Sequence, residues 1–217
     1  ADDIDALLEI ARRYPNCIVV ADEIYDGLDF TGEHVSVASR SEDVPVVALN
    51  GVSKVYYAPG WRIGYMALHD PTNRMGLVRD GLERLLRSRL CASTPAQVGY
   101  LAGLEQDRGW METYSERVLR RRDHCLKRIA QIDGLEVEQP GGAFYMFVRL
   151  TDEQWANDDK AFVLQLLHEE HVLLVHGSGF SPQLGKGHVR LVYLVTLEVL
   201  DEVFDRIERF LKKHRGH

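Results

Sequence analysis

The chain has 217 residues, of which 45% are hydrophobic and 27% are charged, which is typical of a globular protein with a sizeable core. Its 26 basic and 33 acidic residues give a net charge of −7, so the composition gives no reason to expect binding to nucleic acid. The three cysteines are an odd number spread along the chain, which argues against a disulfide framework and favours a reducing, cytoplasmic compartment. No apolar run approaches the length of a membrane span, so we expect no membrane partner.

The first half of the chain alternates helical patterns with short apolar runs. Residues 1–14 lack the basic start and long apolar centre of a signal peptide, and they are predicted to be a helix already under way. The runs at 17–21, 46–50 and 62–68 are predicted strands buried on both faces, as in an α/β sheet. Helices are predicted over 72–90, with Val78, Leu82, Leu85 and Leu86 on one side, and over 94–106 and 110–132.

The last third of the chain changes character. One helix, at about 158–170, lies among four predicted strands, and the clearest helix of the chain follows them, with a wide apolar stripe from Leu197 to Leu211. The basic run Arg120, Arg121 and Arg122 is interpreted as a solvated helix face. "HEEH" at 168–171 lacks the histidine spacing of a zinc protease helix, so no metal site is expected. The four strands are predicted at 135–139, 143–150, 172–176 and 188–194.

Three polar residues follow the first two apolar runs, at the strand ends where ligands bind in α/β sheets. They are Asp22, Tyr25 and Lys54, and Arg62 comes eight residues after the lysine. Burying a carboxylate, a phenol and an amine is costly unless they are paired or bound to a ligand. Each also has a structural interpretation: Asp22 as a helix cap, Tyr25 as a packing residue and Lys54 as a side chain that reaches out of a loop. The combination favours a binding site.

Four sequence motifs carry a resemblance to a known family. "ADEIYDGLDF", "LNGVSKVYYAPGWRIGY", "QPGGAFYMF" and "GHVRLVYL" occur in this order, and together they resemble the fold-type-I aminotransferases of class I/II, which use pyridoxal phosphate. "RLCASTPAQ" and "HVLLVHGSGF" make the chain most similar to the alanine (glutamate–pyruvate) branch. The resemblance implies an α/β fold. Residues 1–107 would be the rear of the large-domain mixed sheet, and residues 108–217 a small α+β domain.

The resemblance gives the polar residues roles. Lys54 matches the lysine that forms a Schiff base with the cofactor and then moves a proton, Asp22 the carboxylate at the pyridine nitrogen, and Tyr25 the phenol at the ring oxygen. Arg62 matches the arginine that binds the cofactor phosphate, because its planar fork suits a dianion, and Ser53 adds a hydroxyl there.

Substrate binding and assembly are implied in the same way. Arg190 matches the arginine that grips the substrate's α-carboxylate. The reaction would transfer an amino group between an L-amino acid, with alanine favoured, and a 2-oxo acid such as 2-oxoglutarate or pyruvate. The resemblance also implies a homodimer whose active sites borrow residues from the neighbouring subunit.

The sequence departs from the family pattern in two ways. Gly51 stands where many members have a phosphate-binding serine, and Tyr57 stands where a small residue is usual. The chain also resembles only the C-terminal part of such enzymes, without the strands, phosphate-cradling amides, stacking aromatic residue and asparagine of the front part. We therefore expect this segment alone to bind the cofactor poorly.

Other functions stay open at this point. An aspartate or aromatic aminotransferase, or a C–S lyase on the same cofactor, would share Lys54, Asp22 and Arg62. A ligand-sensing domain of a transcription regulator would share the fold and retain Arg190.

Overall fold

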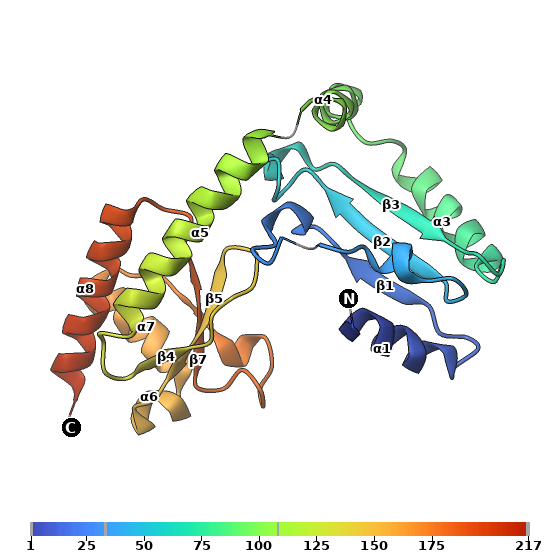
Figure 1. Ribbon diagram of the computed structural model, residues 1–217. Coiled ribbons are helices and arrows are strands. Elements are labelled where there is room, and N and C mark those ends of the chain that lie inside the picture. Colours follow the sequence, from blue (N-terminus) through green and yellow to red (C-terminus); the bar gives the residue numbers. More distant parts are fainter. Residues whose placement is uncertain (1, 33, 108, 216–217) are drawn as a thin grey trace. The chain divides into compact units, whose positions relative to one another are not determined.

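The computed structural model describes residues 2–32, 34–107 and 109–215, and the chain divides into two compact units (Figure 1). The first unit is Ala1–Met111 and the second is Glu112–His217. The boundary predicted between residues 107 and 108 falls just before this division, at the start of the long helix α5 (Gly109–Ile129).

The first unit is built on a three-stranded mixed sheet of order β1-β2-β3 (Figure 1). Strand β1 (Val19–Asp22) is parallel to β2 (Val46–Gly51), and β3 (Gly64–His69) is antiparallel to β2. Residues of α1 and β1 pack with Val44 and Val46 in one apolar cluster, and residues of the loop between β2 and β3 pack with α4 in another. The helices of this unit are α1 (Asp2–Arg12), α2 (Val37–Arg40), α3 (Gly76–Arg89) and α4 (Thr94–Glu105), with 3-10 turns at Asp26–Leu28 and Pro59–Trp61.

The prediction that all three strands are buried on both faces is wrong for β1 and β3. The central strand β2 is buried at Val46 and Val47, whereas Val20 of β1 is 64% exposed and Tyr65 of β3 is 48% exposed. A central strand has neighbours on both sides, and within the part of the chain that the structure describes β1 and β3 each pair on one side only. Continuous apolar runs therefore predict the positions of these strands correctly. They do not predict which strands are buried by other parts of this chain.

Helix α3 differs from its prediction in both its start and its burial. It begins at Gly76 rather than residue 72, because the carboxylate of Asp70 accepts hydrogen bonds from the backbone N–H groups of Arg74 and Met75 and closes a turn there. Its predicted apolar side is real, but Leu85 and Leu86 are 68% and 64% exposed.

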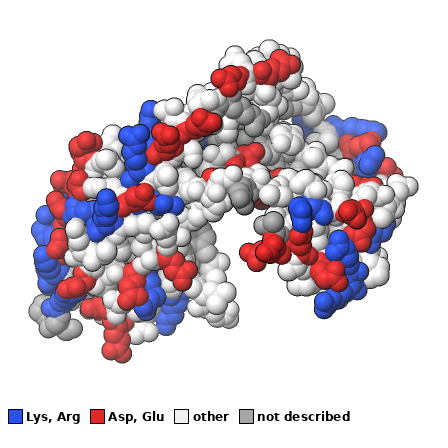
Figure 2. Space-filling view, viewed as in Figure 1, with Lys and Arg blue, Asp and Glu red and all other residues white. Residues whose placement is uncertain are grey.

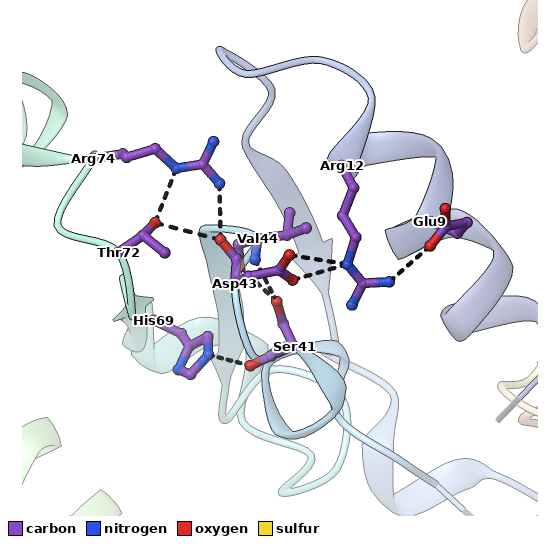
Figure 3. Close-up of polar contacts among 8 residues, drawn as sticks. All are labelled: Glu9, Arg12, Ser41, Asp43, Val44, His69, Thr72 and Arg74. Atoms are coloured by element: carbon purple, nitrogen blue, oxygen red, sulfur yellow. Dashed lines mark hydrogen bonds and ion pairs between the residues drawn. The ribbon is translucent and has the colours of Figure 1, made fainter.

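A polar network fixes the first unit at the sheet edge where β1 and β2 begin and β3 ends (Figure 3). The guanidinium of Arg12 on α1 donates to both carboxylate oxygens of Asp43, at 2.9 and 3.1 Å. Arg74 donates to the backbone carbonyls of Asp43 and Pro15 at 2.8 and 2.7 Å, and His69 contacts the carbonyl of Ser41. These contacts join α1, the loop before β2 and the turn after β3, so they stabilise the edge opposite to the one where Asp22 and Gly51 end their strands.

The second unit is an antiparallel sheet covered on one face by helices (Figure 1). The strand order is β4 (Leu135–Val137), β5 (Tyr145–Leu150), β7 (His188–Val192) and β6 (Val175–His176). Helices α5, α7 (Asp159–Glu170) and α8 (Leu197–His214) supply the apolar side of the core, and a short helix α6 (Glu153–Asn157) precedes α7. The residues that meet in this core include Ile129, Val148, Phe162, Val189, Leu191, Phe204 and Ile207.

The basic run in α5 is only partly the solvated face that the sequence predicts. Arg120 is exposed, but Arg122 is buried and donates to the carbonyl of Pro140 at 3.0 Å and to Asp123 at 2.7 Å. Arg121 donates to the carbonyl of Leu194 at 2.8 Å. A guanidinium carries five N–H donors, so a buried arginine can tie a helix to loop carbonyls, which a charge run read along the sequence does not reveal.

The three cysteines are free thiols, and no helix within the described residues is both long enough and apolar enough to cross a bilayer. Cys125 lies in the core of the second unit, where burial and the nearby carboxylate of Asp201 raise the pKa of its thiol to about 12. The thiol of Cys125 is therefore protonated and unreactive at neutral pH.

Replacing Glu169 by glutamine is expected to reduce the acid sensitivity of the second unit. The amine of Lys213, the ring of His214 and the amide of Gln165 lower the pKa of the Glu169 carboxyl to about 2. A carboxyl whose pKa is lowered on folding contributes stability above its unfolded pKa, and this contribution is lost as the pH falls from about 4.5 towards 2. Urea unfolding followed by circular dichroism across this range should show wild type and Glu169→Gln converging at low pH.

The control for this experiment is Glu112→Gln, at an exposed position of α5 outside the cluster. Basic and acidic side chains are interspersed over the face of the molecule that Figure 2 shows. The stability difference between wild type and Glu169→Gln should also shrink as salt is added, because exposed charges are screened. A Glu169→Gln curve that runs parallel to wild type from pH 5 to pH 2 would contradict the assignment.

Candidate active site

The candidate site of the first unit lies at the edge where β1 and β2 end. Asp22 is the last residue of β1, and the loop after β2 carries Ser53 and Lys54, both half-buried. The amine of Lys54 lies 5.7 Å from the centroid of the Tyr25 ring. Two residues that are 29 positions apart in sequence are thus neighbours, because parallel strands bring their carboxyl ends to one edge.

The end of β2 is also joined to the loop after β1 by a contact that no motif in the sequence marks. The side-chain amide of Asn50 donates to the carboxylate of Asp26 at 3.0 Å, and its oxygen accepts from the N–H of Gly51 at 2.7 Å. The carboxylate of Asp22 accepts from the N–H of Ile24 at 3.4 Å, so it also shapes its own turn. A polar residue at the very end of an apolar run was the available signal for Asn50.

The loop that carries Lys54 contains two non-glycine residues in the left-handed backbone region. Tyr57 has φ = 52° and Arg62 has φ = 53°. Side chains with a β-carbon rarely adopt this conformation, and the surrounding structure has to hold it. Arg62 ends the 3-10 turn Pro59–Trp61, and its guanidinium donates to the carbonyl of Pro59 at 2.7 Å. The backbone therefore places Arg62 by a specific turn rather than on a regular strand, which corrects the prediction of a strand beginning at residue 62.

Gly51 lies where β2 and β3 approach too closely for any side chain. A β-carbon built on Gly51 would lie 2.8 Å from the carbonyl oxygen of Ile63 and 2.9 Å from the α-carbon of Gly64. Both neighbours are backbone atoms, so they cannot move aside as a flexible side chain would. The close approach of β2 and β3 therefore leaves no space at position 51 for the serine that many family members have. Only Ser53 and Arg62 remain as predicted phosphate ligands.

An aromatic cluster holds the Lys54 loop against α4 and the start of α5. Tyr56 packs against Tyr100 with ring centroids 5.6 Å apart and against Trp110 at the same distance, and Tyr65 stacks on Tyr100 at 6.3 Å. Such pairs add about 0.5–1.5 kcal/mol each beyond their buried area. No motif in the sequence marks these rings, although Tyr56 lies two residues from Lys54.

Arg190, the predicted carboxylate ligand, lies on the central strand β7 of the second unit, opposite Phe147 of β5. Its guanidinium carbon is 4.8 Å from the ring centroid of Tyr145 and 4.8 Å from that of Phe180. Its Nε atom is buried and has no hydrogen-bond partner among the described residues. A buried donor of this kind costs free energy unless a ligand or water satisfies it, so this arginine is chemically suited to receive an anion.

The second sheet also has a hollow on the face that carries Phe147, the residue paired with Arg190. A cavity of about 730 Å³ is lined by Tyr145 and Phe147 of β5, by His188 of β7 and by residues 136–140. The ring of Phe147 stacks on His188 with centroids 4.9 Å apart. Among the described residues, no group of three or more His, Cys, Asp or Glu side chains is arranged to hold a metal ion.

Comparison with known proteins identifies the family. The model of the aminotransferase class I and II family matches residues 1–207. The chain is 36% identical to the glutamate-pyruvate aminotransferase AlaA of Haemophilus influenzae, over 98% of this chain and 53% of that protein. It is 32% identical to the alanine aminotransferase of Mycobacterium tuberculosis, over 96% of this chain and 49% of that protein.

Solved structures agree with this result. The structure of an alanine aminotransferase from Pyrococcus furiosus superimposes with a TM-score of 0.93 and 45% identity, over 98% of this chain and 53% of that one. The chain thus spans about half the length of the relatives it matches. The fold, the matched motifs and these similarities together show that the chain belongs to the class I and II aminotransferase family.

Proposed function

We propose that the protein containing this chain is a pyridoxal-phosphate-dependent aminotransferase that transfers an amino group between L-alanine and 2-oxoglutarate, with pyruvate and glutamate as products. The observation that carries the proposal is the contact of the Lys54 amine with the Tyr25 ring at the shared edge of β1 and β2. The printed names of the relatives, alanine and glutamate-pyruvate aminotransferases, support alanine as the amino donor.

The side chains at this edge fit the proposed cofactor chemically. The candidate residues supply an amine, a carboxylate, a phenol, a hydroxyl and a guanidinium, and these groups are chemically suited to the aldehyde, pyridine nitrogen, ring oxygen and phosphate of pyridoxal phosphate. Lys54 would hold the cofactor, Asp22 and Tyr25 would contact its ring, and Ser53 and Arg62 would bind its phosphate. When bound, the cofactor supplies an aldehyde that accepts the amino group and a ring that withdraws electrons from the substrate's α-carbon.

The chain's own residues would transfer the proton, maintain the charge on the ring and bind the substrate. The amine of Lys54 would take the proton from the α-carbon of the amino acid in one half-reaction and deliver a proton to the α-carbon of the 2-oxo acid in the other. The carboxylate of Asp22 would keep a proton on the pyridine nitrogen by opposing its positive charge. Arg190 would bind the α-carboxylate through paired N–H groups and so orient the α-carbon.

The proposal includes a homodimer. It is supported by the apolar side of α3, where Leu85 and Leu86 are 68% and 64% exposed and would be stabilised by burial in a subunit interface.

A panel of half-reactions tests the proposed function. The gene's full product, loaded with pyridoxal phosphate, is mixed with single amino acids, and the visible absorbance of the cofactor is followed. We expect alanine and glutamate to convert the cofactor to its amino form, and pyruvate and 2-oxoglutarate to restore it. Faster conversion by aspartate or an aromatic amino acid would show that this amino acid, and not alanine, is the preferred substrate. Formation of a thiol, pyruvate and ammonia from a sulfur amino acid, or tight binding without conversion, would overturn the transaminase assignment.

A further inference from the structure

The guanidinium of Arg190 is held by two aromatic rings that come from different elements. Tyr145 lies on the neighbouring strand β5, whereas Phe180 lies in the loop after the 3-10 turn Gly177–Gly179. Each ring centroid is 4.8 Å from the guanidinium carbon, within the range of cation–π contacts. The ring of Phe180 is 54% exposed, so burial of its own apolar surface is not a sufficient reason for its position.

The loop that carries Phe180 is anchored by a buried carboxylate. Asp159, the first residue of α7, is only 3% exposed. Its two oxygens accept hydrogen bonds from the N–H and the hydroxyl of Ser178, both at 2.7 Å, and the ring of His176 contacts the same hydroxyl at 3.0 Å. Charge-assisted hydrogen bonds of this length are among the stronger ones in proteins, so Ser178 is fixed two residues before Phe180.

The two ends of this loop also pack closely against each other through their backbones. A β-carbon on Gly177 would lie 2.2 Å from the carbonyl oxygen of Gly185, and one on Gly185 would lie 2.0 Å from the carbonyl oxygen of Gly177. The two ends of the segment 177–185 therefore approach each other through backbone atoms, with no space for a side chain at either glycine. The segment carries Phe180, whose ring lies on the guanidinium of Arg190.

We propose that Phe180, placed by the Asp159–Ser178 contact, is a positioning residue for Arg190. Together with Tyr145, Phe180 holds the guanidinium in place before a ligand binds. The two rings leave the N–H edge of the guanidinium open to a planar carboxylate. An arginine side chain loses rotamer freedom on binding, and a prearranged one loses less of it. This inference rests on the proposed role of Arg190 as the ligand of the substrate's carboxylate.

The geometric part of the inference is tested on the 217-residue chain by nitrogen-15 NMR of arginine side chains, with Arg190→Lys to assign the signal. We expect the Nε–H proton of Arg190 to be shifted upfield by the two rings. Phe180→Leu should move the signal towards those of the other arginines, and Phe180→Tyr should retain its position. Leu184→Ala is the matched control in the same loop, because Leu184 is 85% exposed. An Arg190 signal unchanged in Phe180→Leu would overturn the inference.

The functional part is tested by titrating the same samples with pyruvate, and with the neutral amide pyruvamide as the uncharged probe. We expect pyruvate to move the Arg190 signal, with a dissociation constant raised about tenfold in Phe180→Leu and Asp159→Asn but not in Phe180→Tyr or Leu184→Ala. Equal affinity in Phe180→Leu and wild type would overturn the positioning role. A signal that depends on Phe180 but does not respond to pyruvate would instead overturn the proposed role of Arg190.

Discussion

Replacing Lys54 by alanine will abolish the covalent cofactor adduct that borohydride traps on the wild-type protein. Pyridoxal phosphate has an aldehyde, and the amine that condenses with it must be neutral and close to the cofactor's other ligands. The position of Lys54 supports closeness to these ligands, because it is half-buried beside Tyr25 and one residue after Ser53. The adduct is measured by intact mass after reduction, at cofactor concentrations near those of the protein, and is located by peptide mapping.

Lys127→Ala is the control for this experiment. Lys127 is an exposed lysine on α5 in the second unit and is not one of the candidate-site residues, so its loss should leave the adduct unchanged. The Lys54→Ala protein should keep its circular dichroism spectrum, because a half-buried loop residue contributes little to the core. An adduct of undiminished yield on Lys54→Ala, mapped to another lysine, would show that the family motif does not mark the reactive amine of this chain.

The phosphate group offers a second readout in the same protein. Arg62→Ala should weaken trapping of pyridoxal phosphate but not of pyridoxal, which lacks the phosphate. An equal loss of trapping with both compounds would mean that Arg62 maintains the conformation of the loop and does not bind the phosphate. Its left-handed backbone and its hydrogen bond to the carbonyl of Pro59 would account for that role.

The sequence predicted the fold most reliably where its patterns are periodic. The stripe of α8 appears as Leu200, Phe204, Ile207, Phe210 and Leu211, all buried in the second unit. Helix α4 also begins at Thr94, beside its proline, as predicted. Whether a residue is in a helix or a strand depends largely on its neighbours in sequence, so these elements could be predicted from periodicity.

Burial was predicted less well, because it depends on what lies opposite a surface. The apolar sides of α3 and β3 have the composition of core surfaces, yet Leu86 and Tyr65 are exposed in this chain. Arg122 shows the reverse error, since its charge indicated solvent but its guanidinium bonds the carbonyl of Pro140 inside the second unit. Neither outcome is encoded in a local pattern, because the partner of each surface comes from a distant segment.

The candidate site shows the same division. Residue types at strand ends and the family motif indicated Lys54 and Tyr25, and the parallel pairing of β1 with β2 brings them together. The contact from Asn50 to Asp26 in the first unit and the contact from Phe180 to Arg190 in the second involve turns whose geometry no motif expresses. Supporting residues were missed because they are recognised by the distance to a partner, not by their spacing in sequence.

Replacing Gly51 by serine, the residue that many relatives have at this position, should destabilise the first unit by about 3 kcal/mol. The added β-carbon would meet the carbonyl oxygen of Ile63 at 2.8 Å and the α-carbon of Gly64 at 2.9 Å. Relief requires that the ends of β2 and β3 separate, which weakens their hydrogen bonds at the edge that carries Lys54. The loss is measured by urea unfolding at neutral pH, followed by circular dichroism.

Gly60→Ser is the matched control, because nothing lies within 4 Å of a β-carbon at Gly60 in the same loop. It should change the free energy of unfolding by less than about 0.5 kcal/mol, as most surface substitutions do. Trapping of pyridoxal phosphate should also fall in Gly51→Ser, since the serine hydroxyl cannot reach a ligand without displacing the strand that positions Lys54. A Gly51→Ser protein as stable as wild type, with tighter phosphate binding, would mean that β2 and β3 can open at this point. The chain would then have lost a phosphate ligand by substitution alone, and not through the close approach of its two strands.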